Sequence, residues 1–137
     1  MSRLRRASPL LLAAVLAVAG SLHLLVPGPY DAIVPDLLPA PRLWTYGSGL
    51  AELAVAAAIA RPATRRAGAL AAAALFVLVL PANVQMALDA DGGLARTLAY
   101  ARLPLQVPLV LWALQVRRDA ARVPAPPMSR GGPGVLR

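Results

Sequence analysis

Three ionisable side chains lie inside otherwise apolar stretches of this sequence: His23, Glu52 and Arg102. An ionisable group within a bilayer is costly, so such a residue normally pairs with another polar group, contacts water or has a function. A carboxylate and a guanidinium can form an ion pair, whereas an imidazole can accept and release a proton near neutral pH. We therefore treat these residues as candidates for ion pairing, proton transfer and binding of a polar head group.

Three uncharged polar residues accompany them: Ser48, Asn83 and Gln106. Ser48 lies one helical turn before Glu52, and Gln106 lies one turn after Arg102, so each shares a helix face with its charged neighbour. Nominal depth follows from the helical rise: His23 lies about 5 Å from the end of its apolar stretch, Asn83 and Arg102 about 8 Å, and Glu52 and Gln106 about 14 Å. All depths refer to the same side of the membrane.

The shared depth predicts one polar pocket that opens on the non-cytoplasmic side, formed by His23, Ser48, Glu52, Asn83, Arg102 and Gln106. Within it, Glu52 and Arg102 are expected to form an ion pair. The structural alternatives are that this pair only holds two helices together and that His23 bonds to loop backbone. Asn83 has a structural alternative too, because an amide close to Pro81 can satisfy backbone groups at a kink.

Four apolar stretches must position these residues: 8–26, 43–60, 67–88 and 97–116, each near the ~20 residues that a bilayer core requires. The 137-residue chain is 58% hydrophobic and only 15% charged, far from the composition of a soluble domain. The fold class is therefore all-α, an integral membrane four-helix bundle. Residues 1–7 form a cytoplasmic N-terminus, 8–122 the membrane domain, and the Pro/Gly-rich segment 123–137 a disordered cytoplasmic tail.

Arginine placement predicts the orientation, because positively charged flanks stay in the cytoplasm. All 14 basic residues are Arg, and eleven of them flank the N-terminus, the second loop and the C-terminal side, against Arg42 and Arg96 in the other two loops. Both termini are therefore predicted to be cytoplasmic. One alternative is that the first span is a signal peptide cleaved after Ala17-Val18-Ala19, although the apolar run continues beyond that point.

Residue inventory and charge placement exclude several functions. The chain has no Cys and one His, so thiol chemistry, iron–sulfur clusters and a bis-His haem cannot be built from it, and neither metal nor haem is expected from this chain alone. The net charge of +8 lies at helix ends, which favours a role in topology and contact with anionic lipid over nucleic-acid binding. The first non-cytoplasmic loop, residues 27–42, is apolar and rich in Pro, and we expect it to lie in the membrane interface over the pocket mouth.

The segments AGSLHLLVPGPYDAIVPDLLPAP, YGSGLAELA, RPATRRAG, LPANVQMAL and ARLPLQVPLVLWAL together resemble the DoxX-like family of small four-helix bacterial membrane proteins, over roughly residues 15–116. Positions that match recurrent family residues are His23, Pro27, Tyr30, Pro35, Pro39, Ser48, Gly49, Glu52, Pro81, Asn83, Met86, Arg102, Pro104 and Gln106. One departure is Leu24, where relatives often carry an aromatic residue. The resemblance implies a bacterial inner-membrane protein associated with redox or respiratory chemistry.

The resemblance supports the hypothesis of a redox-associated accessory subunit whose pocket binds a quinone-like molecule. Glu52 would relay a proton, Arg102 would set its charge state, and His23, Asn83 and Gln106 would orient the head group. Its protein partner would be a membrane oxidoreductase subunit or a second copy of the chain, and whether the chain is itself an enzyme is left open. The alternatives are a structural or assembly partner of another membrane enzyme and, less favoured, a small proton-coupled transporter.

Overall fold

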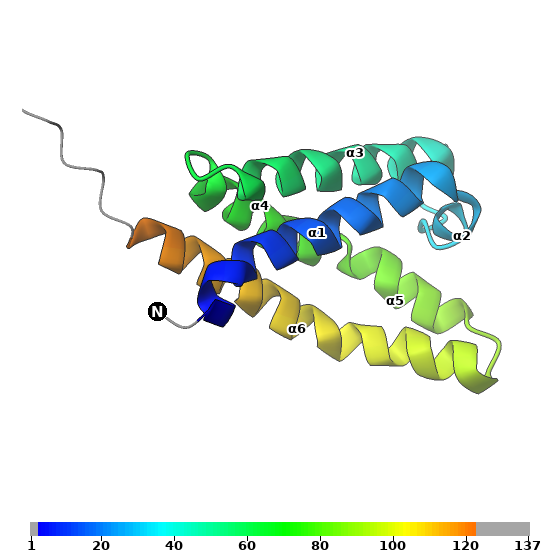
Figure 1. Cartoon of the computed structure of the whole chain (residues 1–137). Helices are drawn as coiled ribbons and strands as arrows, with labels where there is room; N and C mark the ends of the chain where they lie inside the picture. Colours follow the sequence, from blue (N-terminus) through cyan, green and yellow to red (C-terminus); the bar gives the residue numbers. More distant parts are fainter. Residues whose placement is uncertain (1–2, 123–137) are drawn as a thin grey trace, which may run out of the picture.

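The computed structural model describes residues 3–122, and every regular element in that range is an α-helix. In chain order the helices are α1 (Arg3–Leu25), α2 (Gly28–Asp31), α3 (Pro41–Ala60), α4 (Arg65–Leu78), α5 (Leu80–Asp89) and α6 (Gly93–Ala121). Figure 1 shows α1, α3 and α6 as long helices, with α4 and α5 following one another along a common path. The predicted disordered tail, residues 123–137, lies outside the described residues.

Four stretches of the described chain are long and apolar enough to cross a membrane: Ala7–Leu25, Pro41–Ala60, Arg65–Asp89 and Arg96–Ala121. Each corresponds to one predicted span, and their boundaries differ from the predicted ones by a few residues. The all-α class is therefore confirmed, and the four helices are long and apolar enough for the predicted multi-pass membrane protein. The cytoplasmic position of the termini stays a prediction, because the length and composition of the helices do not show which side of the membrane the termini face.

The third span is broken in the middle of the bundle. Helix α4 ends at Leu78 and α5 begins at Leu80. Pro81 follows directly and has no backbone N–H to donate, which favours an interruption of the helix there. On the neighbouring helix, Gln106 Nε2 donates a 2.6 Å hydrogen bond to the carbonyl of Phe76, one turn before the break. Helix α6 thus supplies a donor for α4 at the level where the helix ladder stops.

The helices pack as two pairs, α1 against α3 and α4 against α6, and contacts between α3 and α4 join the pairs. One end of the bundle holds the main core, which contains Leu12, Leu16, Ile59, Phe76, Ala113 and Val116. At this end a 2.7 Å hydrogen bond from Trp112 Nε1 to Ser8 Oγ also ties α6 to α1. Towards the other end, where α2 lies, α5 and α6 run apart from α1 and α3 (Figure 1). We call this second end the loop end.

Two glycines allow the close contact between α1 and α3. A Cβ atom added to Gly20 would lie 2.6 Å from the carbonyl oxygen of Gly49, and one added to Gly49 would lie 2.8 Å from His23 Cβ. Real Cβ atoms essentially never approach other heavy atoms so closely, so larger residues would push the helices apart. In lipid, small residues at a crossing permit the backbone approach that gives packing energy. Gly20 and Gly49 therefore set the spacing at which His23 faces α3.

Candidate functional site

His23 of α1 and Glu52 of α3 face each other in the loop-end half of the bundle. His23 Nδ1 lies 3.2 Å from Glu52 Oε2, and the side chains are 15% and 11% exposed. The two helices run in opposite directions (Figure 1). Because each Cα–Cβ bond tilts towards the N-terminus of its own helix, the side chains of His23 and Glu52 lean towards each other. Helix direction thus closes the difference of about 9 Å between their nominal depths.

Hydrogen bonding engages the Nδ1 edge of the His23 ring. Nδ1 lies 2.8 Å from the carbonyl oxygen of Ala19, one turn earlier on α1, as well as facing Glu52. Both neighbours are acceptors, so the proton lies on Nδ1, where it is donated to the Ala19 carbonyl. In the neutral ring this leaves Nε2 as an acceptor. Among the described residues, no hydrogen bond to Nε2 is formed.

The Glu52 carboxyl is buried and incompletely satisfied. Glu52 is 9% exposed, and its Oε2 atom is buried without a well-directed hydrogen bond, despite the short distance to His23 Nδ1. A buried polar atom without a partner costs free energy, which a proton on the pair or a donor from a bound molecule would offset. The pair is therefore suited to accept a hydrogen bond, or a proton, from a hydroxyl group.

Helix α2 covers the histidine from the loop end. The Tyr30 ring stacks on the His23 ring, with centroids 3.8 Å apart and planes 27° apart. The next residue, Asp31, accepts a 2.7 Å hydrogen bond from Arg42 Nε at the start of α3. These contacts hold α2 between the ends of α1 and α3. A molecule that reaches the imidazole from this end must therefore move Tyr30.

The Asp31 carboxylate is stabilised by its surroundings. The nearby hydroxyl of Thr45, which is 2% exposed, lowers the pKa of Asp31 below its usual value of 3.8, and the Arg42 guanidinium lowers it further. The Thr45 hydroxyl and Asp31 Oδ1 nevertheless have no well-directed hydrogen bond. Arg42 also lies over the Tyr46 ring, with its guanidinium carbon 5.6 Å from the ring centre. The contact between α2 and α3 therefore depends on an ionised Asp31.

The predicted ion pair between Glu52 and Arg102 is wrong. Arg102 is exposed on α6, and its recorded polar contact is a 3.5 Å approach of Nη1 to Met86 Sδ on α5. Glu52 belongs to the α1–α3 pair, and α3 and α6 share no substantial contact. The two residues have similar depth but lie on helices that are not neighbours. His23, and not Arg102 as predicted, is the ionisable neighbour of Glu52.

The other predicted pocket residues lie on three different helices. Ser48 is half-buried on α3, one turn from Glu52, whereas Asn83 is half-buried on α5. Gln106 is engaged with the Phe76 carbonyl and lines a shallow apolar depression of about 230 Å³ between α4 and α6. The structure therefore brings His23 and Glu52 together, with Ser48 nearby. It does not place Asn83, Arg102 or Gln106 in direct contact with that pair.

Two contributors to the site were not identified as such from the sequence. Tyr30 was named only among the positions that match the DoxX-like family, and Asp31 was not singled out. Pro27 and Gly28 turn the chain directly after α1, and the following Tyr30 amide donates to the Pro27 carbonyl over 3.0 Å. The Pro27–Gly28 turn could have predicted this contact from the sequence, because a tight turn brings a residue a few positions after His23 back over the imidazole ring.

Comparison with known protein families matches residues 12–117 to a family described as "Domain of unknown function (DUF8561)". The chain belongs to this family. No curated protein and no solved structure matches the chain. The matched residues of the DUF8561 domain include the whole α1–α3 pair from Leu12 onwards, and thus His23, Tyr30 and Glu52. The family carries no link to DoxX-like proteins, so that resemblance stays a prediction.

Proposed function

We propose that this protein is a redox-associated membrane accessory protein that binds the head group of a quinone-like molecule at His23 and Glu52. The observation that carries the proposal is the 3.2 Å contact between an imidazole and a buried carboxyl in the loop-end half of the bundle. The redox association derives from the resemblance to DoxX-like proteins. The location of the proposed site, and its capacity to exchange a hydrogen bond or a proton, derive from the His23–Glu52 contact.

A quinone head group fits the chemistry of this pair. It is a planar ring with carbonyl oxygens that become hydroxyls on reduction, so it needs a hydrogen-bond donor in one state and an acceptor in the other. Nε2 of His23 can donate when the imidazole is protonated, and Nε2 of the neutral ring or Glu52 Oε2 can accept. Tyr30 shows that a flat ring can stack on the imidazole at 3.8 Å. We therefore propose that the head group replaces Tyr30 when α2 moves.

The pairing of Glu52 with histidine rather than arginine favours proton exchange. An imidazole and a carboxyl that share one proton are neutral overall, whether the proton lies on His23 or on Glu52. The proton can thus change place without leaving a net charge in a low-dielectric site. An arginine partner would hold its own proton at all ordinary pH values.

The same observation supports a second candidate function, proton-coupled transport. A permanent Arg102 charge beside Glu52 would have argued against a carboxyl that exchanges its proton for a cationic substrate. With His23 as the neighbour, that argument no longer applies. Transport predicts that substrate and protons compete for Glu52, whereas an accessory protein predicts binding without movement across the membrane.

Thermal unfolding of the purified full-length protein in detergent, with and without a short-chain ubiquinone analogue, tests the proposal. A molecule that binds only the folded state at about 100 times its Kd stabilises it by roughly 2.7 kcal/mol. His23→Gln and Glu52→Gln should largely remove this shift. Leu75→Ala, in the apolar half of α4, should retain it and thus controls for non-specific effects of a hydrophobic compound.

Two further variants define the extent of the site. Asn83→Leu and Arg102→Gln alter the α5–α6 pair, which does not contact His23 and Glu52 directly. A retained shift in both would place the ligand at the α1–α3 pair alone. No shift in the parent protein, or equal shifts in the parent and in His23→Gln and Glu52→Gln, would refute quinone binding and favour a structural or assembly role. Uptake of a cationic dye into proteoliposomes, driven by a proton gradient, would instead indicate transport.

A further inference from the structure

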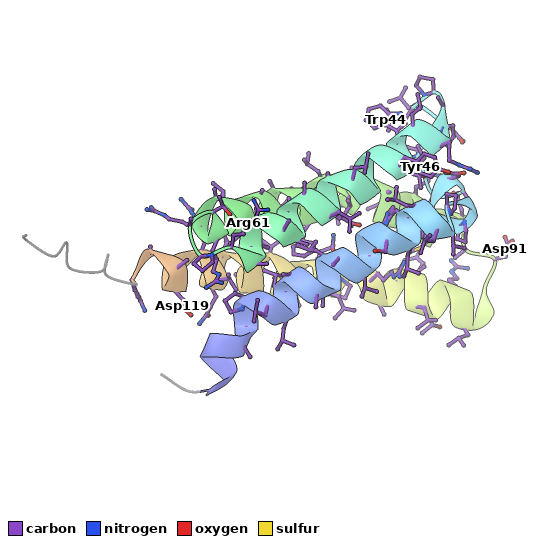
Figure 2. All side chains as sticks on the ribbon, turned by 45° about the horizontal axis from the view of Figure 1, so that its top comes forward. Trp44, Tyr46, Arg61, Asp91 and Asp119 are labelled. Atoms are coloured by element: carbon purple, nitrogen blue, oxygen red, sulfur yellow. The ribbon has the colours of Figure 1, made fainter. Side chains whose placement is uncertain are left out.

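Arginine side chains collect at the end of the bundle opposite α2, which we call the arginine end. They come from the turn between α3 and α4 and from the last turns of α6: Arg61, Arg65, Arg66, Arg117, Arg118 and Arg122. Helix α4 packs along α6, so these two segments lie close together. Figure 2 shows Arg61 and Asp119 at this end, and Trp44, Tyr46 and Asp91 at the opposite end. Asp119 is the only acidic residue in the two described segments.

One of these arginines already has an internal role. Arg65 donates to the carbonyl of Ile59 through Nε at 2.9 Å and to the carbonyl of Ala60 through Nη2 at 3.1 Å. It thereby satisfies the last carbonyl groups of α3. Thr64 Oγ1 likewise donates to the carbonyl of Ala58 at 2.8 Å instead of capping α4. Arg65 and Thr64 are therefore parts of the helix junction.

Four of the five remaining arginines are available to an external group. Arg61, Arg66, Arg118 and Arg122 are exposed, and none forms an ion pair within the described part of the chain. At the loop end the situation differs, since Arg42 binds Asp31 and Arg96 lies over the Tyr100 ring at 5.8 Å. The first turn of α4 adds to the positive potential, because it has neither an acidic residue nor a side-chain cap.

Exposed apolar side chains continue from two of these arginines along the bundle. On α4, Leu70 and Val77 follow Arg66 at helical spacing and are 46% and 55% exposed. On α6, Leu111 precedes Arg118 by two turns and is 60% exposed. Each helix thus presents a cationic head followed by an apolar stripe. A phospholipid has the complementary pattern, a phosphate head with hydrocarbon chains. A soluble anion has no hydrocarbon chain that could contact the apolar stripes.

We infer that the arginine end binds anionic phospholipid, with phosphate groups at Arg61, Arg66, Arg118 and Arg122 and acyl chains along the apolar stripes of α4 and α6. Guanidinium groups bind phosphate through paired, charge-assisted hydrogen bonds. Near a charged membrane surface each Arg contributes about 1 kcal/mol, or roughly fivefold in affinity. This inference does not depend on the proposed function or on which side of the membrane the arginine end faces.

Native mass spectrometry of the full-length protein in neutral detergent, with equal amounts of phosphatidylglycerol and phosphatidylcholine, tests this inference. The parent protein should retain phosphatidylglycerol preferentially. Arg66→Gln/Arg118→Gln should lower that preference by roughly 25-fold, from two losses of fivefold each. The matched control, Arg42→Gln/Arg96→Gln, makes the same change of net charge at the loop end and should keep the preference. Circular dichroism verifies that both variants remain helical.

Three results would overturn the inference. The first is equal retention of the two lipids by the parent protein. The second is an equal loss of preference in the matched control, which would show that net charge alone decides. The third is full displacement of phosphatidylglycerol by inorganic phosphate at matched ionic strength, which would identify a site for a free anion. Arg66→Lys/Arg118→Lys should keep more of the preference than Arg66→Gln/Arg118→Gln, because it retains both charges although it loses the paired hydrogen bonds.

Discussion

Replacing Gly49 by alanine should separate α1 from α3 next to the His23–Glu52 pair, because Gly49 lies one turn before Glu52 on α3 and contacts His23. The new Cβ would lie 2.8 Å from His23 Cβ and 2.9 Å from the carbonyl oxygen of Gly20. The second of these is a backbone atom, so it cannot turn away like the end of a flexible side chain. The helices must therefore move apart or tilt to restore ordinary van der Waals contact.

The expected cost is that of inserting one methyl group into a close-packed contact, about 1–3 kcal/mol. Gly47→Ala is a matched control on the same helix, because a Cβ at Gly47 meets nothing within 4 Å. By helix propensity alone, each change from glycine to alanine favours the helix by about 1 kcal/mol. The steric cost at Gly49 offsets or exceeds this gain, so Gly49→Ala should be less stable than Gly47→Ala by about 1–3 kcal/mol.

Unfolding of both variants in detergent, followed by circular dichroism, measures the stability difference. Nuclear magnetic resonance of the imidazole measures the effect on the site, and His23 is the only histidine, so its signals need no assignment. In Gly49→Ala these signals should shift, whereas in Gly47→Ala they should stay near the parent positions. If Gly49→Ala is as stable as Gly47→Ala and leaves the imidazole signals unchanged, the close α1–α3 contact does not exist as described.

Three other predictions address the helix break, the loop and the orientation. Gln106→Leu should destabilise the protein by about 1–3 kcal/mol in chemical or thermal unfolding, because it leaves the Phe76 carbonyl without its donor; Gln115→Leu, at an exposed site on the same helix, should be nearly neutral. Since the folded-state pKa of Asp31 is lowered, its stabilising contribution is present above the usual value of 3.8 and is lost as pH falls below it. Asp31→Asn should therefore remove part of the acid sensitivity measured in an unfolding series from neutral to acid pH; an unchanged series would contradict the role of Asp31. Cysteines at Asp36 and Asp91 should react with an impermeant thiol reagent in intact cells, while one at Thr64 should not, and labelling of Thr64→Cys from outside would reverse the predicted orientation.

The membrane spans could be predicted from the sequence because one variable, apolar length, determines them. A helix must supply roughly 20 apolar residues to cross the hydrocarbon core, and four such stretches are legible without knowing any contact. Pro81 likewise indicated a kink in the third span. The donor at the break was harder to predict, because Gln106 lies on another helix and its reach to the Phe76 carbonyl depends on how α4 and α6 pack.

The site was only partly predictable because depth gives the position of a residue along the membrane normal and not its position in the membrane plane. His23, Glu52 and Arg102 do lie within the apolar helices, as predicted, but depth does not show which helices are neighbours or which faces meet. Equal depth led to the wrong pairing of Glu52 with Arg102. Helix rotation and direction, fixed here by the Gly20–Gly49 contact, instead bring Glu52 to His23.

The uneven core provides a physical route by which a ligand could reach this pair. Buried apolar side chains such as Leu12, Ile59 and Val116 lie at the arginine end, whereas α2, at the loop end, has no buried residue and is held by a few polar and aromatic contacts. Local opening costs least where few apolar contacts must be broken. Moving α2 requires loss of the Tyr30 stack and the Asp31–Arg42 bond, while the core that joins the two helix pairs stays intact. If a ligand binds at His23 and Glu52 as proposed, opening of α2 should therefore admit it at a lower free energy than unfolding of the bundle.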